Sequence, residues 1–206
     1  PIHLWEYNKV GQNPSHTLII QMRNHNFPEW NSAFFKSLDE TRQSKWLSDL
    51  LHSAIYLTVQ QYGEFTPRTQ GTQPCDNTPL MLFAKQRIPK MANGDYLQLV
   101  NYMIYHAHGG LCLVDNRQMN CVMLAVGGGN YVFVKWAYQH VIELAEHGFD
   151  WNHRNKDGRN ALCLTQNGVH SHQQIKGMME SLGNMRWIER IEHSDGTGLS
   201  ALRSDG

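Results

Sequence analysis

Apolar residues recur every three or four positions over most of the chain, which is the spacing of a helix with one buried face. The longest such run covers residues 40–62, and Gly63 follows it. Residues 16–22, HTLIIQM, are the exception, because their β-branched side chains favour a strand or a buried extended segment. Shorter runs with the helical spacing predict further helices over 29–38, 78–86, 93–110, 121–126, 132–147, 161–165, 174–182 and around 187–191.

A short motif marks the beginning of several of these predicted helices. At Thr78-Pro79-Leu80, the threonine can cap the helix, the proline occupies the first helical position, and the leucine faces the core. Weaker copies of the motif begin at Asn120, Asn160 and Ser200, with spacings of 42, 40 and 40 residues from Thr78 onward. Such repetition at a nearly fixed period is typical of a solenoid of stacked helical units.

The segment 148–168, GFDWNHRNKDGRNALCLTQNG, resembles the junction between two ankyrin repeats. Asn155 stands where the family prefers aspartate, and Asn160 where it prefers threonine. The usual ankyrin period is about 33 residues, so each unit here carries roughly seven more. Armadillo and HEAT repeats have a period of about 40–47 but lack the Thr-Pro-Leu and Gly-x-Asp motifs seen here. The positions that match the family pattern are Gly148, Asp150, Asn152, Gly158, Ala161 and Leu162.

This resemblance implies an all-α fold, an irregular ankyrin-like solenoid of three to four repeats over residues 74–206. Residues 1–73 are expected to form an N-terminal segment with a helical hairpin that caps the repeats, because an uncapped solenoid end exposes apolar surface. The family binds other proteins on a concave surface built from the turns between repeats and the exposed side of the first helices. Matching positions are Lys85, Gln86, Asn116, Arg117, Met119, Trp151, His153, Lys156, Asp157 and Arg159.

The function that the resemblance implies is protein–protein recognition. Irregular repeats and a polar surface rich in Asn, Gln and His are similar to ankyrin-repeat effectors that intracellular bacteria secrete into host cells, which implies a eukaryotic host protein as partner and the host cytoplasm as location. The alternative is an enzyme with its catalytic groups in the N-terminal segment and the repeats as a docking scaffold; a self-assembling structural protein is a third reading. The polar candidates for the enzyme are His3, Glu6, His16, His25, Asp39, Glu40, Asp49 and His52.

Composition narrows these possibilities. The 18 basic and 18 acidic residues give no net charge, so no global field attracts nucleic acid or an anionic membrane. No apolar run approaches the 18 residues of a membrane span, and the first residues lack the layout of a signal peptide. We therefore expect a cytosolic protein. Its four cysteines, which form no C-x-x-C pair, are expected to be reduced thiols; they are Cys75, Cys112, Cys121 and Cys163.

No cofactor or metal site is predicted. The pairs His106/His108 and His170/His172 are two residues apart, whereas two ligands on one helix face need a spacing near four. The glycines of 127–130, GGGN, lack the Lys-Ser or Lys-Thr that ends a phosphate loop. No cysteine lies in a catalytic signature.

Overall fold

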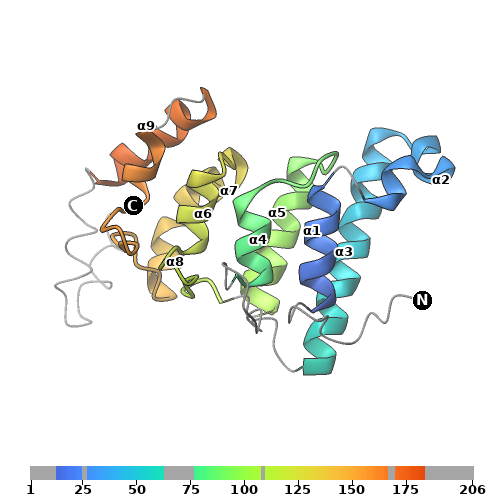
Figure 1. Cartoon of the computed structure of the whole chain (residues 1–206), viewed down its shortest axis with the longest axis horizontal. Helices are drawn as coiled ribbons and strands as arrows, with labels where there is room; N and C mark the ends of the chain where they lie inside the picture. Colours follow the sequence, from blue (N-terminus) through green and yellow to red (C-terminus); the bar gives the residue numbers. More distant parts are fainter. Residues whose placement is uncertain (1–12, 25–26, 63–76, 108–109, 167–169, 184–206) are drawn as a thin grey trace, which may run out of the picture.

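The computed structural model describes residues 13–24, 27–62, 77–107, 110–166 and 170–183, and in these ranges the chain forms helices and no strands (Figure 1). The predicted all-α class is confirmed. The predicted helix around 187–191, the motif copy at Ser200 and the linker residue Cys75 lie outside the described residues. The helical elements are α1 (Pro14–Arg23), η1 (Pro28–Asn31), α2 (Ala33–Ser37), α3 (Glu40–Tyr62), α4 (Pro79–Lys85), α5 (Asn93–Asn101), η2 (Tyr102–His106), α6 (Cys121–Gly127), α7 (Tyr131–Gln139), α8 (Val141–Glu146), η3 (Leu162–Gln166) and α9 (His170–Gly183).

The prediction of a strand or extended segment over 16–22 is wrong, because α1 covers it. Asn13 caps this helix by accepting a hydrogen bond from the backbone N–H of His16, and Pro14 occupies the first helical position. Ile19 and Met22, three residues apart, are fully buried on one face. Capping and burial at a helical spacing therefore outweigh the β-branched composition.

Two predicted helices are interrupted. The helix expected over 29–38 divides into η1 and α2, because the Ser32 side chain caps a new helix by accepting from the N–H of Phe35. The helix expected over 132–147 divides at His140, whose ring Nδ1 lies 2.8 Å from the carbonyl oxygen of Trp136. The backbone of His140, with a φ of −108° and a ψ of 24°, departs from helical values at this point. The predicted loop before residue 174 is also partly helical, since α9 begins at His170.

The helices lie in two rows (Figure 1). In the first row, α1, α4, α6 and η3 contact one another in chain order. In the second row, α3, α5, α7 and α9 do the same. Contacts of α1 with α3, α6 with α7 and η3 with α9 join the two rows, and the apolar core lies between them.

The C-terminal ends of the first-row helices meet at Gly128. A Cβ atom added there would lie 1.7 Å from the carbonyl oxygen of Lys85, so only glycine allows α4 and α6 to approach so closely. Beside this contact, Asn130 donates from Nδ2 to the carbonyl of Ala84 and to the buried hydroxyl of Tyr96, both at 2.8 Å. The Tyr96 hydroxyl in turn donates to the carbonyl of Phe83 at 3.0 Å. Backbone packing and buried hydrogen bonds thus hold this edge.

The N-terminal ends of α1 and α4 meet at the buried side chain of His16. Its Nδ1 lies 2.8 Å from Oδ1 of Asn13, and its Nε2 lies 3.0 Å from the carbonyl oxygen of Asn77. Burial lowers the pKa of His16 to about 4, while the hydrogen bond with the Asn77 carbonyl acts in the opposite direction. We therefore assign the neutral imidazole at neutral pH. A buried residue with this structural role is poorly placed to be the catalytic group considered above.

Candidate binding surfaces

Two turns of the same construction precede α6 and η3; we call residues 115–119 and 155–159 the finger turns. In the first, the Asp115 carboxylate accepts hydrogen bonds from the N–H groups of Arg117 at 2.9 Å and Met119 at 2.8 Å. In the second, Oδ1 of Asn155 accepts from the N–H groups of Asp157 at 3.0 Å and Arg159 at 2.9 Å. The equivalent positions are 40 residues apart, as the sequence motif is.

The backbone of the two finger turns is equivalent as well. Gln118 has a φ of 60° and Gly158 a φ of 72°, both in the left-handed region. Each turn leads into an asparagine cap: Asn120 accepts from the N–H of Met123 at 2.9 Å, and Asn160 accepts from the N–H of Cys163 at 3.0 Å. The predicted capping at positions 120 and 160 is confirmed, as is that of Thr78 on α4.

Hydrogen bonds join the two finger turns to each other. The N–H of Lys156 donates to the carbonyl oxygen of Arg117 at 3.0 Å. His153 reaches across from the chain before the second turn, with Nε2 at 2.8 Å from the carbonyl oxygen of Gln118, while its Nδ1 lies 3.9 Å from an Asp150 carboxylate oxygen. Two irregular segments are therefore held as one surface.

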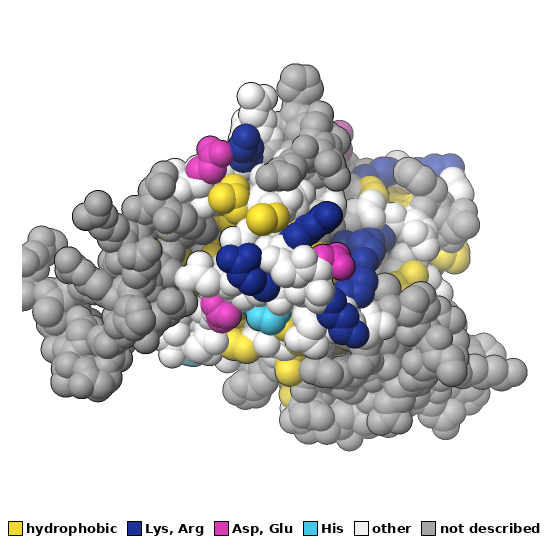
Figure 2. Space-filling model, turned by 60° about the vertical axis from the view of Figure 1, so that its left-hand side comes forward, with side chains coloured by type: hydrophobic (Ala, Val, Ile, Leu, Met, Phe, Trp, Pro, Cys, Tyr) yellow, Lys and Arg dark blue, Asp and Glu magenta, His cyan; other side chains and the backbone are white. Residues whose placement is uncertain are grey.

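The finger turns bring together most of the predicted contact residues. The side chains of Asn116, Arg117, Lys156, Asp157 and Arg159 are exposed there. Arg117 lies 3.3 Å from the buried Asp115 carboxylate. Figure 2 turns the α9 end of the molecule toward the viewer and shows Lys and Arg side chains beside one another, with single Asp and Glu side chains among them.

Met119 and Trp151 are less accessible than these five residues. Met119 is 8% exposed and belongs to the core, and its sulfur accepts from Nδ2 of Asn155 at 3.5 Å, so it presents little surface to a partner. The ring of Trp151 is half-buried and packs edge-on against Phe149, with 4.9 Å between centroids. Its Nε1–H is buried and has no acceptor in the described part of the chain.

Lys85 and Gln86 do not join this surface. They end α4 next to Gly128, at the C-terminal end of the first row, whereas the finger turns lead into the N-terminal ends of α6 and η3. A helix of seven residues, such as α6, separates the two edges by about 10 Å. The structure therefore divides the predicted contact residues between two edges of the first row.

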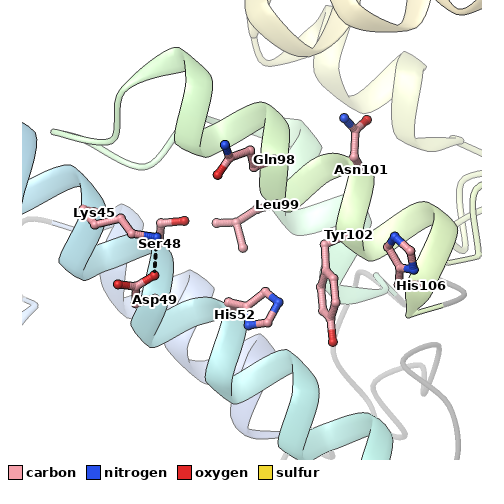
Figure 3. Close-up of a pocket in the computed structure, with 9 residues that line it drawn as sticks. All are labelled: Lys45, Ser48, Asp49, His52, Gln98, Leu99, Asn101, Tyr102 and His106. Atoms are coloured by element: carbon pink, nitrogen blue, oxygen red, sulfur yellow. Dashed lines mark hydrogen bonds and ion pairs between the residues drawn. The ribbon is translucent and has the colours of Figure 1, made fainter.

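A pocket of about 440 Å³ lies between α3 and the α5–η2 segment (Figure 3). Nζ of Lys45 donates to Asp49 at 2.8 Å, and the His52 ring lies against Tyr102 with 4.1 Å between centroids. On its other side Tyr102 faces His106, 5.7 Å away. The lining residues are Lys45, Ser48, Asp49, His52, Gln98, Leu99, Asn101, Tyr102 and His106.

This pocket contains two of the polar residues considered for catalysis, Asp49 and His52, but not in a catalytic arrangement. A nucleophile needs a base within hydrogen-bond reach and a group that orients the base. Asp49 instead pairs with Lys45, and His52 packs on Tyr102. Asp39 pairs with Arg42 at the surface, away from the pocket lining.

Other catalytic and metal candidates receive little support. Glu40 is exposed at the beginning of α3, away from the pocket lining, while His3, Glu6 and His25 lie outside the described residues. No group of three His, Cys, Asp or Glu side chains that could hold a metal occurs among the residues described. The sequence offers no local signal that Gln98, Tyr102 and His106 line a pocket with α3, because their position beside α3 depends on long-range packing.

Comparisons with known proteins leave the resemblance to ankyrin repeats as a prediction. No protein-family model matches this sequence, and no curated protein of similar sequence is found. Within the described ranges, none of the helices has the length and apolar character needed to cross a membrane.

Proposed function

We propose that this chain is a protein-recognition module that binds a partner protein on the surface of the finger turns. The observation that carries the proposal is the repeated turn geometry, in which Asp115 and Asn155 hold equivalent backbone N–H groups. Side-chain hydrogen bonds fix each turn, and the contact from Lys156 to Arg117 fixes one turn against the other. A surface held in place before binding loses little conformational entropy when the partner arrives.

The finer fold is part of the same proposal: an irregular ankyrin-like solenoid of three to four repeats. Its support is the agreement between three features. The capping positions recur at 40 to 42 residues, the finger turns recur at 40 residues, and the helices lie in two rows in which each helix contacts the next one of its own row. A host protein as partner rests on the resemblance to secreted effectors alone.

The charged side chains of the finger turns give the surface its chemistry. Lys156 and Arg159 are exposed, and neither is paired with a carboxylate among the described residues. Arg154, just before the second turn, donates to the carbonyl of Gly158 at 2.8 Å, so its guanidinium is held over that turn. Arginine in particular is favoured in the cores of protein interfaces.

The test is affinity capture from a eukaryotic cell lysate, read by mass spectrometry. One bait is the intact chain, and the second carries Arg117→Glu, Lys156→Glu and Arg159→Glu. A matched control reverses three exposed charges elsewhere, with Lys36→Glu, Arg42→Glu and Lys176→Glu. We expect a partner that the intact chain and the control retain and the finger variant loses, with all three baits equally helical by circular dichroism. Retention by all three baits would place the binding surface elsewhere.

The pocket between α3 and α5 favours a second candidate, the enzyme reading. It lies where the N-terminal segment meets the first predicted repeat and contains His52, Tyr102 and His106. An activity that is lost in His52→Ala but kept in the finger variant would support it. If His52→Ala leaves every activity found in the intact chain unchanged, this candidate fails.

A further inference from the structure

The pocket between α3 and the α5–η2 segment contains a buried hydroxyl group without a hydrogen-bond partner. Ser48 of α3 is 6% exposed and lines the pocket. Its side chain makes no hydrogen bond within the described part of the chain, whereas Ser53 on the same helix donates to the carbonyl of Asp49 at 2.8 Å. Figure 3 shows the Ser48 oxygen directed from α3 toward Gln98 and Leu99. Buried polar groups nearly always have a partner, so this hydroxyl is available to a ligand in the pocket.

The facing wall of the pocket, on α5, supplies two amide groups. Gln98 is exposed, and its side chain makes no hydrogen bond in the ranges that the structure describes. Asn101 is oriented by α7, because its Oδ1 accepts from the indole Nε1–H of Trp136 at 2.9 Å. That contact leaves the Nδ2 group of Asn101 to donate to another acceptor. Leu99, which is 2% exposed, lines the pocket with an apolar side chain. Polar groups on two helices therefore flank an apolar patch.

The acidic and basic side chains of the pocket compensate each other. Lys45 and Asp49 form an ion pair, with 2.8 Å between Nζ and Oδ1 (Figure 3). The hydrogen bond and the charge of Asp49 raise the pKa of Lys45, so the lysine stays protonated. No other Lys, Arg, Asp or Glu of the described residues lines the pocket. A charged ligand would meet both signs of charge at one place, so a neutral ligand fits better.

Three aromatic rings also line the pocket. Tyr102 lies between His52 and His106, with centroid distances of 4.1 and 5.7 Å. Rings at such distances are in contact, so neither face of Tyr102 is open for a planar base to stack on. The N–H of Ala107 donates to the carbonyl of Tyr102 at 2.9 Å, which makes η2 a single π-helical turn. Such turns are rare and are found frequently at functional sites.

We propose that this pocket binds a carbohydrate, a neutral ring with several hydroxyl groups, between Ser48 of α3 and the amides of Gln98 and Asn101. Each sugar hydroxyl can both donate and accept a hydrogen bond, which matches a hydroxyl on one wall and amides on the other. The C–H groups of the sugar ring are apolar and suit the side chain of Leu99. Because the pocket has no catalytic arrangement, the sugar is bound and released unchanged. This site goes beyond the proposed recognition function and does not depend on it.

The experiment measures binding of free sugars to the full chain by saturation-transfer NMR, a method that detects weak ligands. The probes are glucose, galactose, mannose and N-acetylglucosamine, each titrated separately. We expect at least one of them to bind. Ser48→Ala and Gln98→Ala should each weaken that binding by at least about fivefold, because each removes a hydrogen-bonding group. If none of the four sugars binds, the proposal is overturned.

Matched controls make the same changes outside the pocket lining. Ser53→Ala and Gln60→Ala both alter exposed positions of α3 and should leave the dissociation constant unchanged. Losses equal to those of the pocket variants would overturn the site. Ser48→Ala also separates binding from a structural role: because Ser48 has no partner and alanine favours the helix, its thermal unfolding temperature should not fall. A clear fall would show that the hydroxyl serves the fold and not a ligand.

Further probes test the class of ligand and its source. Adenine is a planar base and glucuronate is a charged sugar, so tighter binding of either than of every neutral sugar would overturn the proposed class. Methyl glycosides of the sugar that binds mimic a sugar attached to a larger molecule. If they bind as the free sugar does, the site accepts attached sugars. If only the free sugar binds, the ligand is a free monosaccharide; the site is supported in both cases.

Failure here is distinguishable from failure of the proposed function. The finger variant with Arg117→Glu, Lys156→Glu and Arg159→Glu should bind the sugar as the intact chain does. If that variant loses its partner in the lysate while no sugar binds to the intact chain, the recognition module stands and the sugar site falls. If a sugar binds through Ser48 while the finger variant loses no partner, the sugar site stands and the finger surface falls. Conversion of the sugar, seen as new resonances, would overturn binding without chemistry and favour the enzyme candidate.

Discussion

The two edges of the first row of helices are built in different ways. At the N-terminal edge, polar side chains hold the backbone: His16 bridges α1 to the segment before α4, and Asp115 and Asn155 hold the finger turns. At the C-terminal edge, the backbone of Gly128 packs directly against α4. The N-terminal edge therefore depends mainly on side-chain hydrogen bonds, whereas the C-terminal edge combines close backbone packing with the buried hydrogen bonds of Asn130 and Tyr96.

This difference explains why the N-terminal edge is the better candidate for binding. A turn fixed by its own side-chain oxygen needs no cover from other elements, so its tip can remain exposed. The following substitutions test this contrast, from the largest expected effect to the smallest.

Gly128→Ala should have the largest effect on stability. The added Cβ would lie 1.7 Å from the backbone oxygen of Lys85, which cannot rotate away. We expect a loss of more than about 3 kcal/mol in the free energy of unfolding, measured with urea, or failure to fold. Gly127→Ala is the matched control, because its Cβ would meet nothing within 4 Å and alanine favours the helix end by up to about 1 kcal/mol. Similar stabilities of the two variants would contradict the close contact.

Acidification should act through His16 at the N-terminal edge. The unfolded chain binds a proton near the ordinary pKa of 6.5, whereas burial lowers the folded pKa to about 4. Above pH 6.5 the neutral His16 side chain is present in both states, so its ionisation does not reduce the free energy of unfolding. As the pH falls from 6.5 toward 4, only the unfolded chain binds the proton, and the free energy of unfolding decreases by roughly 3 kcal/mol in total. Urea unfolding at several pH values between 7.5 and 4 measures it. His16→Gln should reduce this dependence and His52→Gln, at an exposed site, should not; equal pH dependence in the intact chain and in His16→Gln would refute the assignment.

The two finger turns should respond unequally to loss of the side chain that holds them. Asp115 is buried and accepts from two backbone N–H groups and from Arg117, so Asp115→Ala should cost about 2 to 3 kcal/mol. Asn155 accepts the equivalent bonds at a more exposed position, so Asn155→Ala should cost about 1 kcal/mol. Urea unfolding gives both values. If Asn155→Ala costs more than Asp115→Ala, burial does not set the strength of these hydrogen bonds.

Local chemistry explains which parts of this fold could be predicted from sequence. The caps at Thr78, Asn120 and Asn160 follow from side chains that act within three residues, so a single sequence contains the whole signal. The cap of α1, at Asn13 and Pro14, is of the same kind, but the β-branched residues that follow it favour a strand in the local pattern.

The remaining features depend on contacts between distant parts of the chain. Nothing near Met119 distinguishes a surface methionine from one that packs into the core against the next turn. The meeting of Arg23 with Gln86, and of His52 with Tyr102, requires neighbouring helices to be placed first. The 40-residue spacing of the sequence motif therefore predicts where the finger turns lie, but it does not predict which of their side chains are exposed.

The smallest predicted effect tests whether the finger turns are equivalent in backbone as well as in hydrogen bonding. Gln118 and Gly158 occupy the same left-handed position, which is strained for a residue with a side chain. Gln118→Gly should therefore stabilise the protein by up to about 1 kcal/mol, and Gly158→Ala should destabilise it by about the same amount, as measured by thermal unfolding. The Gly158→Ala cost comes from the backbone alone, since its Cβ would meet nothing within 4 Å. If Gln118→Gly instead destabilises the protein, the side chain of Gln118 makes contacts that outweigh the backbone strain. The first finger turn would then be stabilised by a side chain that the second turn, with Gly158 at this position, does not have.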